Sequence, residues 1–183
     1  MSSYFEKVFT IEKSEYMYEI AQEELKGYSN IKLLKGDSRE VLPKILSLHL
    51  NNILFWLDAH WSGGKTYGED DECPLVDELQ IIFSECYGKN YAILIDDARL
   101  FLAPPPLPHN WRKWPTIVDI VKLVPEKFDL LIFNDVIYIY PETISSDFRD
   151  FIQELSIEAW REKQSFIYNI KLAIRSLFKG KFL

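Results

Sequence analysis

Short apolar runs alternate with longer segments of helical periodicity through the first two thirds of the chain. The apolar runs are rich in β-branched and aromatic residues, which is typical of strands. The predicted strands are Val8–Glu12, residues 30–35, residues 53–58 and Tyr91–Ile95. The predicted helices are residues 14–26, 39–48, 74–87 and 115–123. Repeated strand–helix units predict an α/β, Rossmann-like fold with a mostly parallel sheet and helices on both faces.

The ends of several segments carry residues that favour helix starts and stops. Ser14 suits an N-cap, and Gly27 suits a C-terminal stop. Pro74 and Pro115 suit the first turn of a helix. The strand at residues 53–58 is apolar almost throughout, as expected for a parallel strand that is buried on both faces.

The next segment predicts a C-terminal antiparallel β-hairpin. Two apolar runs, Phe128–Phe133 and residues 136–140, are separated by Asn134 and Asp135. Two strands joined by two turn-forming residues are typical of a hairpin. The hairpin would add an antiparallel strand at one edge of the sheet.

The last segment, Ser145–Phe178, has the periodicity of an amphipathic helix. We therefore expect an α/β domain over residues 1–142 and a C-terminal helical extension over residues 143–183, packed on the same domain. A packing helix with a solvated face is the preferred interpretation, and a membrane-surface helix is the alternative because of its mild basic bias.

Composition and charge narrow the class of protein. Hydrophobic residues make up 48% and aromatic residues 15% of the 183, enough for a packed core. The net charge is -7, and residues 151–183 hold six Lys and Arg against three Glu, so the rest of the chain carries -10. An acidic main body argues against a nucleic-acid partner, because phosphate binding needs a basic surface.

Cysteine usage and hydropathy indicate a cytoplasmic protein without a membrane span. Cys73 and Cys86 form no C-x-x-C pair, so we expect two reduced thiols rather than a zinc site. The first residues, MSSYFEKVF, contain no apolar core of a signal peptide. No apolar run approaches the ~18 residues that a membrane span needs.

Carboxylates follow each of the four predicted parallel strands: Glu12, Asp37, Asp58, and Asp96 with Asp97. Ligands of open α/β sheets bind at these carboxyl ends. A Glu after such a strand can accept both hydroxyl protons of a ribose, and an Asp at the next strand end can accept from an adenine amino group. The alternative for Glu12 is a helix-terminal acid stabilised by the helix dipole.

The set formed by Asp58, Asp96 and Asp97 suggests a metal site. Converging carboxylates repel one another, so they either have raised pKa values or hold a cation. Hard oxygen ligands suit Mg²⁺ or another divalent ion. The alternative is that one carboxylate caps a helix, another is solvated, and no metal binds.

His60 and three tryptophans are further candidates near that edge. His60, two residues after Asp58, suits a general base or a metal ligand. The alternative is a histidine that only hydrogen-bonds within its loop. Trp61, Trp111 and Trp114 are expected to pack in the core or anchor loops rather than line a substrate pocket.

Residues 5–141 resemble class I S-adenosylmethionine-dependent methyltransferases. The run VFTIEKSEYMYEIAQEEL is similar to the second strand and following helix of that family, and IKLLKGDSREVLPKIL to the third strand with its acidic adenine-side turn. The runs ILFWLDAHWSGG and YAILIDDARLF are similar to the fourth and fifth strands, and the hairpin to the final strand pair. The resemblance implies that Glu12 holds the ribose and that Asp37 and Ser38 lie beside the adenine.

Within that family, an Asp after the fourth strand and an acidic pair after the fifth resemble the pattern of metal-dependent O-methyltransferases. That resemblance implies that Asp58, Asp96 and Asp97 bind a metal, with Mg²⁺ as the candidate, and that Asp58 also lies at the cofactor. Asp58 and His60 are then the candidate catalytic residues. The reaction implied is methyl transfer from the sulfonium of S-adenosylmethionine to an oxygen of a small-molecule or sugar-like acceptor.

The chain departs from the family at its start. The family's first strand and glycine-rich turn would precede Val8, where only seven residues stand. That strand lies between the second and fourth, so we expect a gap at the centre of the sheet with unpaired backbone groups on both sides. Three explanations are open: a missing N-terminal segment, a strand taken from another chain, as in a homo-oligomer, and a closed-up sheet that has lost activity.

Two alternatives to a methyltransferase remain. A metallophosphoesterase would use Asp58 and His60 as a D-x-H pair, but the Gly36-Asp37 block stands on the wrong side of that pair and no N-H-[DE] triplet follows. A non-catalytic remnant or interaction module needs no cofactor. Binding of the methyl donor therefore separates a methyltransferase from both alternatives.

Overall fold

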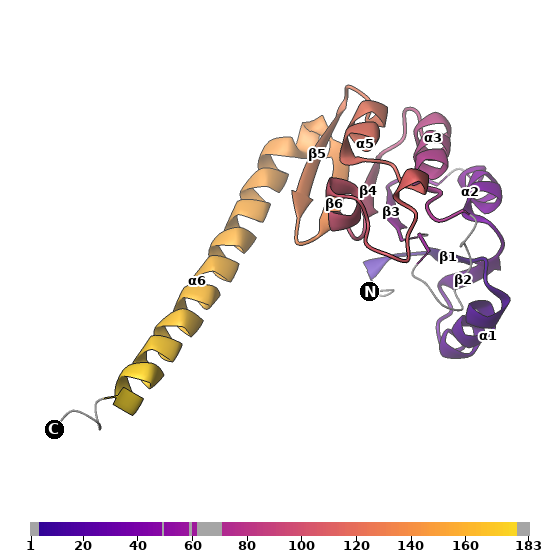
Figure 1. Cartoon of the computed structure of the whole chain (residues 1–183). Coiled ribbons are helices and arrows are strands. Elements are labelled where there is room, and N and C mark those ends of the chain that lie inside the picture. Colours follow the sequence, from indigo (N-terminus) through magenta and orange to yellow (C-terminus); the bar gives the residue numbers. More distant parts are fainter. Residues whose placement is uncertain (1–3, 49, 59, 62–70, 179–183) are drawn as a thin grey trace. The chain divides into compact units, whose positions relative to one another are not determined.

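The structure is a computed structural model that describes residues 4–48, 50–58, 60–61 and 71–178 (Figure 1). The chain divides into two compact units, Met1–Pro141 and Glu142–Leu183. The sequence, rich in Gly and acids, predicts an open loop over residues 61–72, and residues 62–70 of it lie outside the described residues. Packing of the helical extension on the α/β domain stays a prediction.

The first unit opens with a two-stranded parallel sheet. Strands β1 (Val8–Glu12) and β2 (Ile31–Lys35) pair in register from Val8 opposite Ile31. Helix α1 (Glu15–Glu24) connects them. Ser14 is its N-cap, and its hydroxyl accepts a hydrogen bond from the Met17 amide at 3.4 Å, so the predicted cap is confirmed.

A second sheet has four strands in the order β3-β4-β6-β5. Strands β3 (Ile53–Leu57) and β4 (Tyr91–Ile95) are parallel. Strand β6 (Val136–Pro141) pairs antiparallel with both β4 and β5 (Phe128–Phe133). The second strand of the hairpin therefore lies inside the sheet, and the first lies at its edge.

The predicted mixed α/β class is confirmed, but the prediction of one mostly parallel sheet is not. The described strands form two sheets, and two of their four pairings are antiparallel. Both antiparallel pairings involve β6, which pairs with β4 at one edge and with β5 at the other. The break falls between β1 and β3, the two strands on either side of the gap expected from the sequence.

The hairpin itself is confirmed. Phe133 pairs with Val136, so the loop has two residues. Asn134 and Asp135 have φ angles of 48° and 65°, as both central residues of a type I′ turn require. Asn and Asp adopt this left-handed conformation at a lower cost than β-branched residues.

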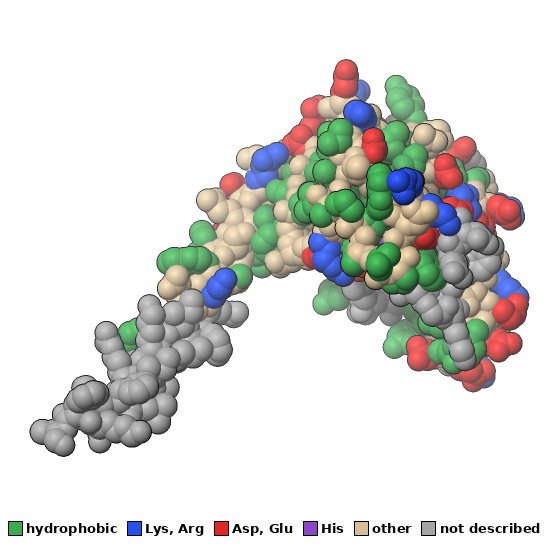
Figure 2. Space-filling model, viewed as in Figure 1, with side chains coloured by type: hydrophobic (Ala, Val, Ile, Leu, Met, Phe, Trp, Pro, Cys, Tyr) green, Lys and Arg blue, Asp and Glu red, His purple; other side chains and the backbone are tan. Residues whose placement is uncertain are grey.

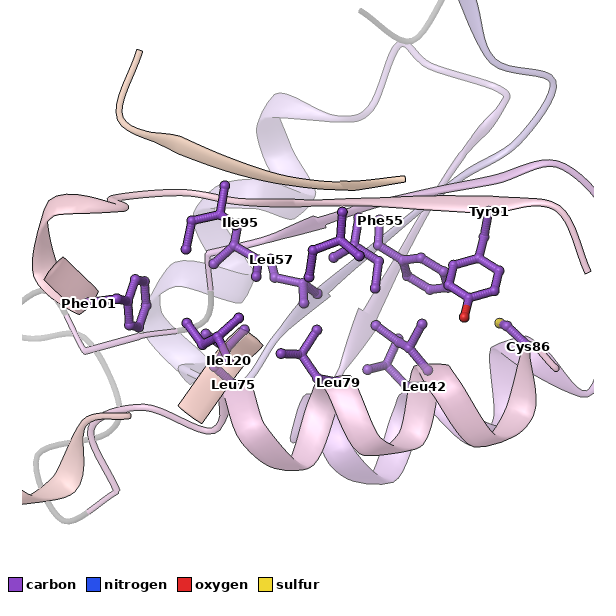
Figure 3. Packing of buried hydrophobic residues seen from close by; sticks show 14 of the residues in the cluster. Leu42, Phe55, Leu57, Leu75, Leu79, Cys86, Tyr91, Ile95, Phe101 and Ile120 are labelled. Atoms are coloured by element: carbon purple, nitrogen blue, oxygen red, sulfur yellow. The ribbon is translucent and has the colours of Figure 1, made fainter. Parts of the chain in front are cut away.

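Three helices cover one face of the four-stranded sheet: α2 (Ser38–Leu46), α3 (Leu75–Glu85) and α5 (Ile117–Leu123). Figure 3 shows side chains of these helices meeting those of β3 and β4. The labelled contacts include Leu42, Leu79 and Ile120 from the helices and Phe55, Leu57 and Ile95 from the strands. Burial of this continuous apolar layer is the main stabilising contribution to the unit.

Between β4 and α5 the chain follows an irregular, proline-rich path. It contains the short helix α4 (Arg99–Leu102), the 3₁₀ turn η2 (Trp111–Lys113) and a cis peptide bond before Pro108. The sequence predicts a loop here because proline lacks a backbone donor. The two short helical turns are not apparent from hydrophobic periodicity, which needs a longer window.

The second unit consists of η3 (Glu142–Ile144) and the 34-residue helix α6 (Ser145–Phe178). The predicted helix is confirmed. In the described part of the chain, no helix is long and apolar enough to cross a membrane. Figure 2 shows acidic side chains over the region of α1 and α2, in keeping with the negative charge of the main body.

Candidate functional site

The carboxyl ends of the parallel strands meet at one edge of the first unit. Arg39, in the first turn of α2, pairs with Asp71 at 2.6 Å and with Asp77 at 3.3 Å. Helix α2 follows β2, and both aspartates follow β3 along the chain. The ion pairs therefore place the carboxyl ends of β2 and β3 on the same side, where an open α/β sheet binds its ligands.

Glu12 lies at the end of β1 and contributes to the start of α1. Its Oε1 accepts a hydrogen bond from the Ser14 amide at 2.6 Å, one of the amides that a helix start leaves without an intrahelical partner. This contact matches the alternative interpretation of Glu12. A carboxylate has about four lone-pair sites, so the contact leaves capacity for ribose hydroxyls. The ribose role stays a prediction.

Asp37 is the N-cap of α2 and is held by two cations. Its Oδ1 accepts from the Arg39 amide at 3.0 Å, and its carboxylate pairs with the Arg39 guanidinium at 2.7 Å and with Lys13 at 2.6 Å. The Arg39 side chain, helped by Lys13 and opposed by burial, holds the pKa of Asp37 well below its usual range. Asp37 is therefore a firmly ionised anchor, and its role beside an adenine stays a prediction.

Ser38 contacts a buried acid that sequence reasoning missed. Glu78 of α3 is 2% exposed, and the Ser38 side chain hydrogen-bonds to it. Burial raises the pKa of Glu78 above its usual value, against the lowering effect of that hydrogen bond. Helical periodicity does not predict a buried Glu78, because a lone Glu on an amphipathic helix is usually on its solvated face.

Asp58, His60 and Asp97 form a cluster at the ends of β3 and β4. His60 Nε2 lies 3.0 Å from Asp97 Oδ2, and His60 Nδ1 lies 3.5 Å from Asp58 Oδ1. The His60 side chain is 9% exposed, Asp97 is 26% exposed and Asp58 is 53% exposed. The imidazole also packs on the Trp114 ring, with centroids 5.4 Å apart. His60 is thus fixed between two carboxylates, while Asp58 faces solvent.

Asp97 occupies an unusual backbone conformation. Its φ angle is 56°, and its amide donates to Asp96 Oδ1 at 2.9 Å. Its Oδ1 pairs with Arg99 at 2.7 Å, and Arg99 also pairs with Asp135 in the hairpin turn. A left-handed residue next to a functional edge is a recurrent sign of a site whose geometry is imposed by its surroundings.

Asp58 is the acid of the cluster whose pKa is raised above its ordinary value. Partial burial raises its pKa, the neighbouring His60 opposes this, and Asp96 and Asp97 raise it further. A carboxylate with a raised pKa is a better proton acceptor than an ordinary one. This combination of perturbation and exposure is what a general base requires.

The donor atoms of Asp58, His60 and Asp97 all lie within 4.8 Å of one another, close enough to hold one metal ion. The sequence suggested Asp58, Asp96 and Asp97, but Asp96 is outside this group and its carboxylate accepts from Asp97 instead. One imidazole and two carboxylates suit Mn²⁺, Fe²⁺ or Zn²⁺ better than Mg²⁺, which prefers oxygen ligands alone. Metal binding stays a prediction.

A second buried acid, Glu72, holds the segment from Asn110 to Trp114, which packs on His60 of this cluster. It is 3% exposed and accepts hydrogen bonds from Trp114 Nε1 at 2.8 Å and from the Asn110 amide at 3.0 Å. Since Trp114 packs on His60, Glu72 supports the cluster indirectly. The sequence predicts only that Trp114 packs or anchors a loop, and no local pattern identifies its partner.

A groove of about 440 Å³ lies between the start of α3 and the segment from η2 to α5. Trp114 lines it, together with charged side chains of both signs: Asp77, Arg112, Lys113 and Asp119. Pockets with a few polar groups on an apolar wall are typical of small-molecule sites. Asp58, His60 and Asp97 do not line the groove, and its link to the cluster is Trp114, whose ring packs on His60.

Comparison with known proteins indicates the fold. No model of a known protein family matches the sequence, and no curated protein sequence does so. Among solved structures, the methyltransferase PaMTH1 of Podospora anserina, bound to S-adenosylhomocysteine, is similar with a TM-score of 0.51 and 19% sequence identity. The match covers 74% of this chain and 61% of PaMTH1, so this chain corresponds to less than two thirds of that protein. The chain therefore has a methyltransferase-like α/β fold.

Proposed function

We propose that this chain is an S-adenosylmethionine-dependent methyltransferase that acts on an oxygen of a small-molecule or sugar-like acceptor. The observation that carries the proposal is the cluster of Asp58, His60 and Asp97 at the ends of two parallel strands. The similarity to a methyltransferase bound to S-adenosylhomocysteine supports it. The neighbouring groove, with polar groups of both signs, suits an acceptor that is rich in hydroxyl groups.

The chemistry would be a direct methyl transfer. Asp58 accepts the proton of the acceptor hydroxyl, because its raised pKa makes it the better base and half of its side chain is exposed. His60, fixed between Asp58 and Asp97, orients the carboxylate. The acceptor oxygen then bonds to the methyl carbon while the carbon–sulfur bond breaks, and the electron pair of that bond neutralises the sulfonium.

A divalent cation defines a second version of the proposal. In that version Asp58, His60 and Asp97 would hold the cation, and its charge would lower the pKa of the acceptor hydroxyl. Asp58 would then be a metal ligand and not the base, so its role as base belongs to the version without a cation. The alternative is the assignment expected from the sequence, in which Asp58, Asp96 and Asp97 hold Mg²⁺. A comparison of Mg²⁺ with Mn²⁺ in the same binding experiment separates the two.

The cofactor would bind along the same edge of the strands. Glu12 would accept the ribose hydroxyls with the capacity that its bond to Ser14 leaves. Asp37 and Ser38 would lie at the adenine, at the start of α2. The Asp37 carboxylate is already paired with Lys13 and Arg39. We therefore expect Ser38 to move more readily than Asp37 when the adenine binds.

The test is a calorimetric titration of the purified chain with S-adenosylhomocysteine, alone and with Mg²⁺ or Mn²⁺. Micromolar binding, about -8 kcal/mol, is the expected result. Glu12→Ala removes the ribose contact and should abolish measurable binding. Glu19→Ala removes an exposed acid of α1 and serves as the matched control, with unchanged binding.

A folded sample that does not bind S-adenosylhomocysteine would refute the proposal. It would favour the second candidate, a non-catalytic interaction module. The specific observation in favour of that candidate is the break between β1 and β3, which lies at the edge where the cofactor would bind.

A further inference from the structure

The charge of helix α6 changes sign part of the way along it. Residues 145–162 hold five Asp and Glu against two Arg, whereas residues 163–183 hold five Lys and Arg and no acid. The helix runs without a break from Ser145 to Phe178 (Figure 1). Basic residues stabilise the carboxyl end of a helix dipole, but that effect is confined to the last turn. Lys163 and Lys171 stand before that turn, so the dipole does not account for them.

Apolar residues of the same stretch recur with helical periodicity. They are Phe166, Ile167, Ile170, Ile174, Leu177 and Phe178. At 3.6 residues per turn, these positions fall within roughly 120° of the helix circumference. Lys171 and Arg175 fall beside that arc. An apolar face with a basic flank and no acid is the pattern of a helix that lies in an anionic membrane surface.

The structure leaves this part of the helix without cover among the described residues. Ile152 is buried, whereas every described residue from Ser156 to Tyr168 is exposed. Trp160 is 62% and Tyr168 is 63% exposed. Trp160 stands seven residues before Ile167, so it continues the apolar face toward the middle of the helix. Helices gain most of their stability from packing of an apolar face, so we expect another surface to cover this one.

We propose that the basic half of α6, residues 163–178, binds in the surface of a membrane that contains anionic lipids. The apolar face enters the boundary between headgroups and acyl chains. Lys171 and Arg175 meet the negative headgroups from the flank of that face. Trp160 and Tyr168 suit the same boundary, because their rings are apolar and carry a polar tip.

A second copy of this chain fits the same face less well. In a parallel pair of helices, the two basic halves would lie together and repel each other. In an antiparallel pair, the basic half would lie against the acidic half of the other copy. There Ile152 is already buried and Leu155 half-buried, so part of the apolar surface of that half is already covered. A lipid surface supplies both the negative charge and the apolar layer.

The test measures how the full chain partitions onto vesicles of phosphatidylcholine, alone or with about one third phosphatidylserine. A Lys or Arg near an anionic surface strengthens binding about fivefold, so binding to the anionic vesicles should be at least roughly tenfold stronger. Raised salt should weaken it, because salt screens these charges. Emission of Trp160 should move to shorter wavelength on binding, and Trp160→Phe should remove that shift while it keeps the binding.

Two matched variants separate the apolar face from charge alone. Ile174→Asp and Ser176→Asp add the same charge, the first within the apolar arc and the second on roughly the opposite side of the helix. Ile174→Asp should abolish binding, and Ser176→Asp should keep most of it. The double variant Lys171→Gln with Arg175→Gln leaves the apolar residues in place and should weaken binding to anionic vesicles roughly tenfold or more. It decides the question even if Ile174→Asp does not form the helix.

Three results would overturn the proposal. One is equal binding to neutral and anionic vesicles, or no binding to either at low salt. Another is an equal effect of Ile174→Asp and Ser176→Asp. The third is a dimer in lipid-free solution, seen by sedimentation, that Ile174→Asp dissociates, because a second copy would then cover the face. None of these measurements depends on cofactor binding, so the proposal can fail without the proposed function failing.

Discussion

Glu72 offers the sharpest test of how the loop beside the candidate site is held. Its buried carboxylate accepts from Trp114 Nε1 at 2.8 Å and from the Asn110 amide at 3.0 Å. Hydrogen bonds to a charged group contribute about 1.5–3 kcal/mol each, and a buried donor that loses its partner costs a similar amount. Because water can reach part of a relaxed loop, we expect Glu72→Ala to lower the free energy of unfolding by roughly 2–4 kcal/mol.

The same residue predicts a pH dependence. Burial alone would raise the pKa of Glu72, but the bonds from Trp114 and Asn110, with the charges of Lys113 and His109, bring it below its ordinary value of 4.5. A lowered pKa in the folded state means that ionised Glu72 stabilises the protein above pH 4.5. This contribution is lost as the pH falls through the folded-state pKa. Glu72→Gln, which cannot ionise, should lack this part of the acid dependence.

Thermal unfolding followed by near-ultraviolet circular dichroism would measure both effects. For a chain of this size, a loss of 2–4 kcal/mol lowers Tm by roughly 4–16 °C. Glu85→Ala, at an exposed position of α3, is the matched control and should stay within about 0.5 kcal/mol of the parent. The reasoning is refuted if Glu72→Ala unfolds like that control, or if Glu72→Gln keeps the full acid dependence.

Two further predictions concern local structure. Thr116 and Asp119 form a capping box at the start of α5, so Thr116→Ala should cost about 1 kcal/mol while Thr116→Ser should cost little, as measured by urea unfolding. Asn134 has a φ of 48° in the hairpin turn, so Asn134→Val should destabilise by about 1–2 kcal/mol. Asn134→Gly should be close to neutral in the same assay, and equal stability of the Val and Gly variants would contradict the turn assignment.

Much of the local structure could be predicted from sequence periodicity. The bounds of β1 and β4 match the predicted strands, and Ser14 caps α1 as expected. The hairpin at Asn134 and Asp135 was also predictable, since a two-residue turn with positive φ angles has few acceptable residues. These features depend on neighbours within about four positions along the chain, which the sequence displays directly.

The candidate site could be predicted only in part. The strand-end rule located Asp58 and Asp97, because strand ends are visible in the sequence. The sequence also put His60 forward as a base or metal ligand at this edge, but it could not tell whether His60 or Asp96 completes the group. That choice depends on which way each carboxylate turns, and the turn of Asp96 toward the Asp97 amide is a tertiary detail.

By itself, the sequence determined the order of strands and helices, the caps, the hairpin and the row of acids at the strand ends. Only the tertiary structure decided which strands pair, that β6 lies between β4 and β5, and that the described strands form two separate sheets. It also decided that Glu72 reaches Trp114 across 42 residues. The physical reason is that periodicity is fixed by local backbone geometry, whereas the partner of a strand edge or a buried carboxylate is selected by contacts between segments distant in sequence.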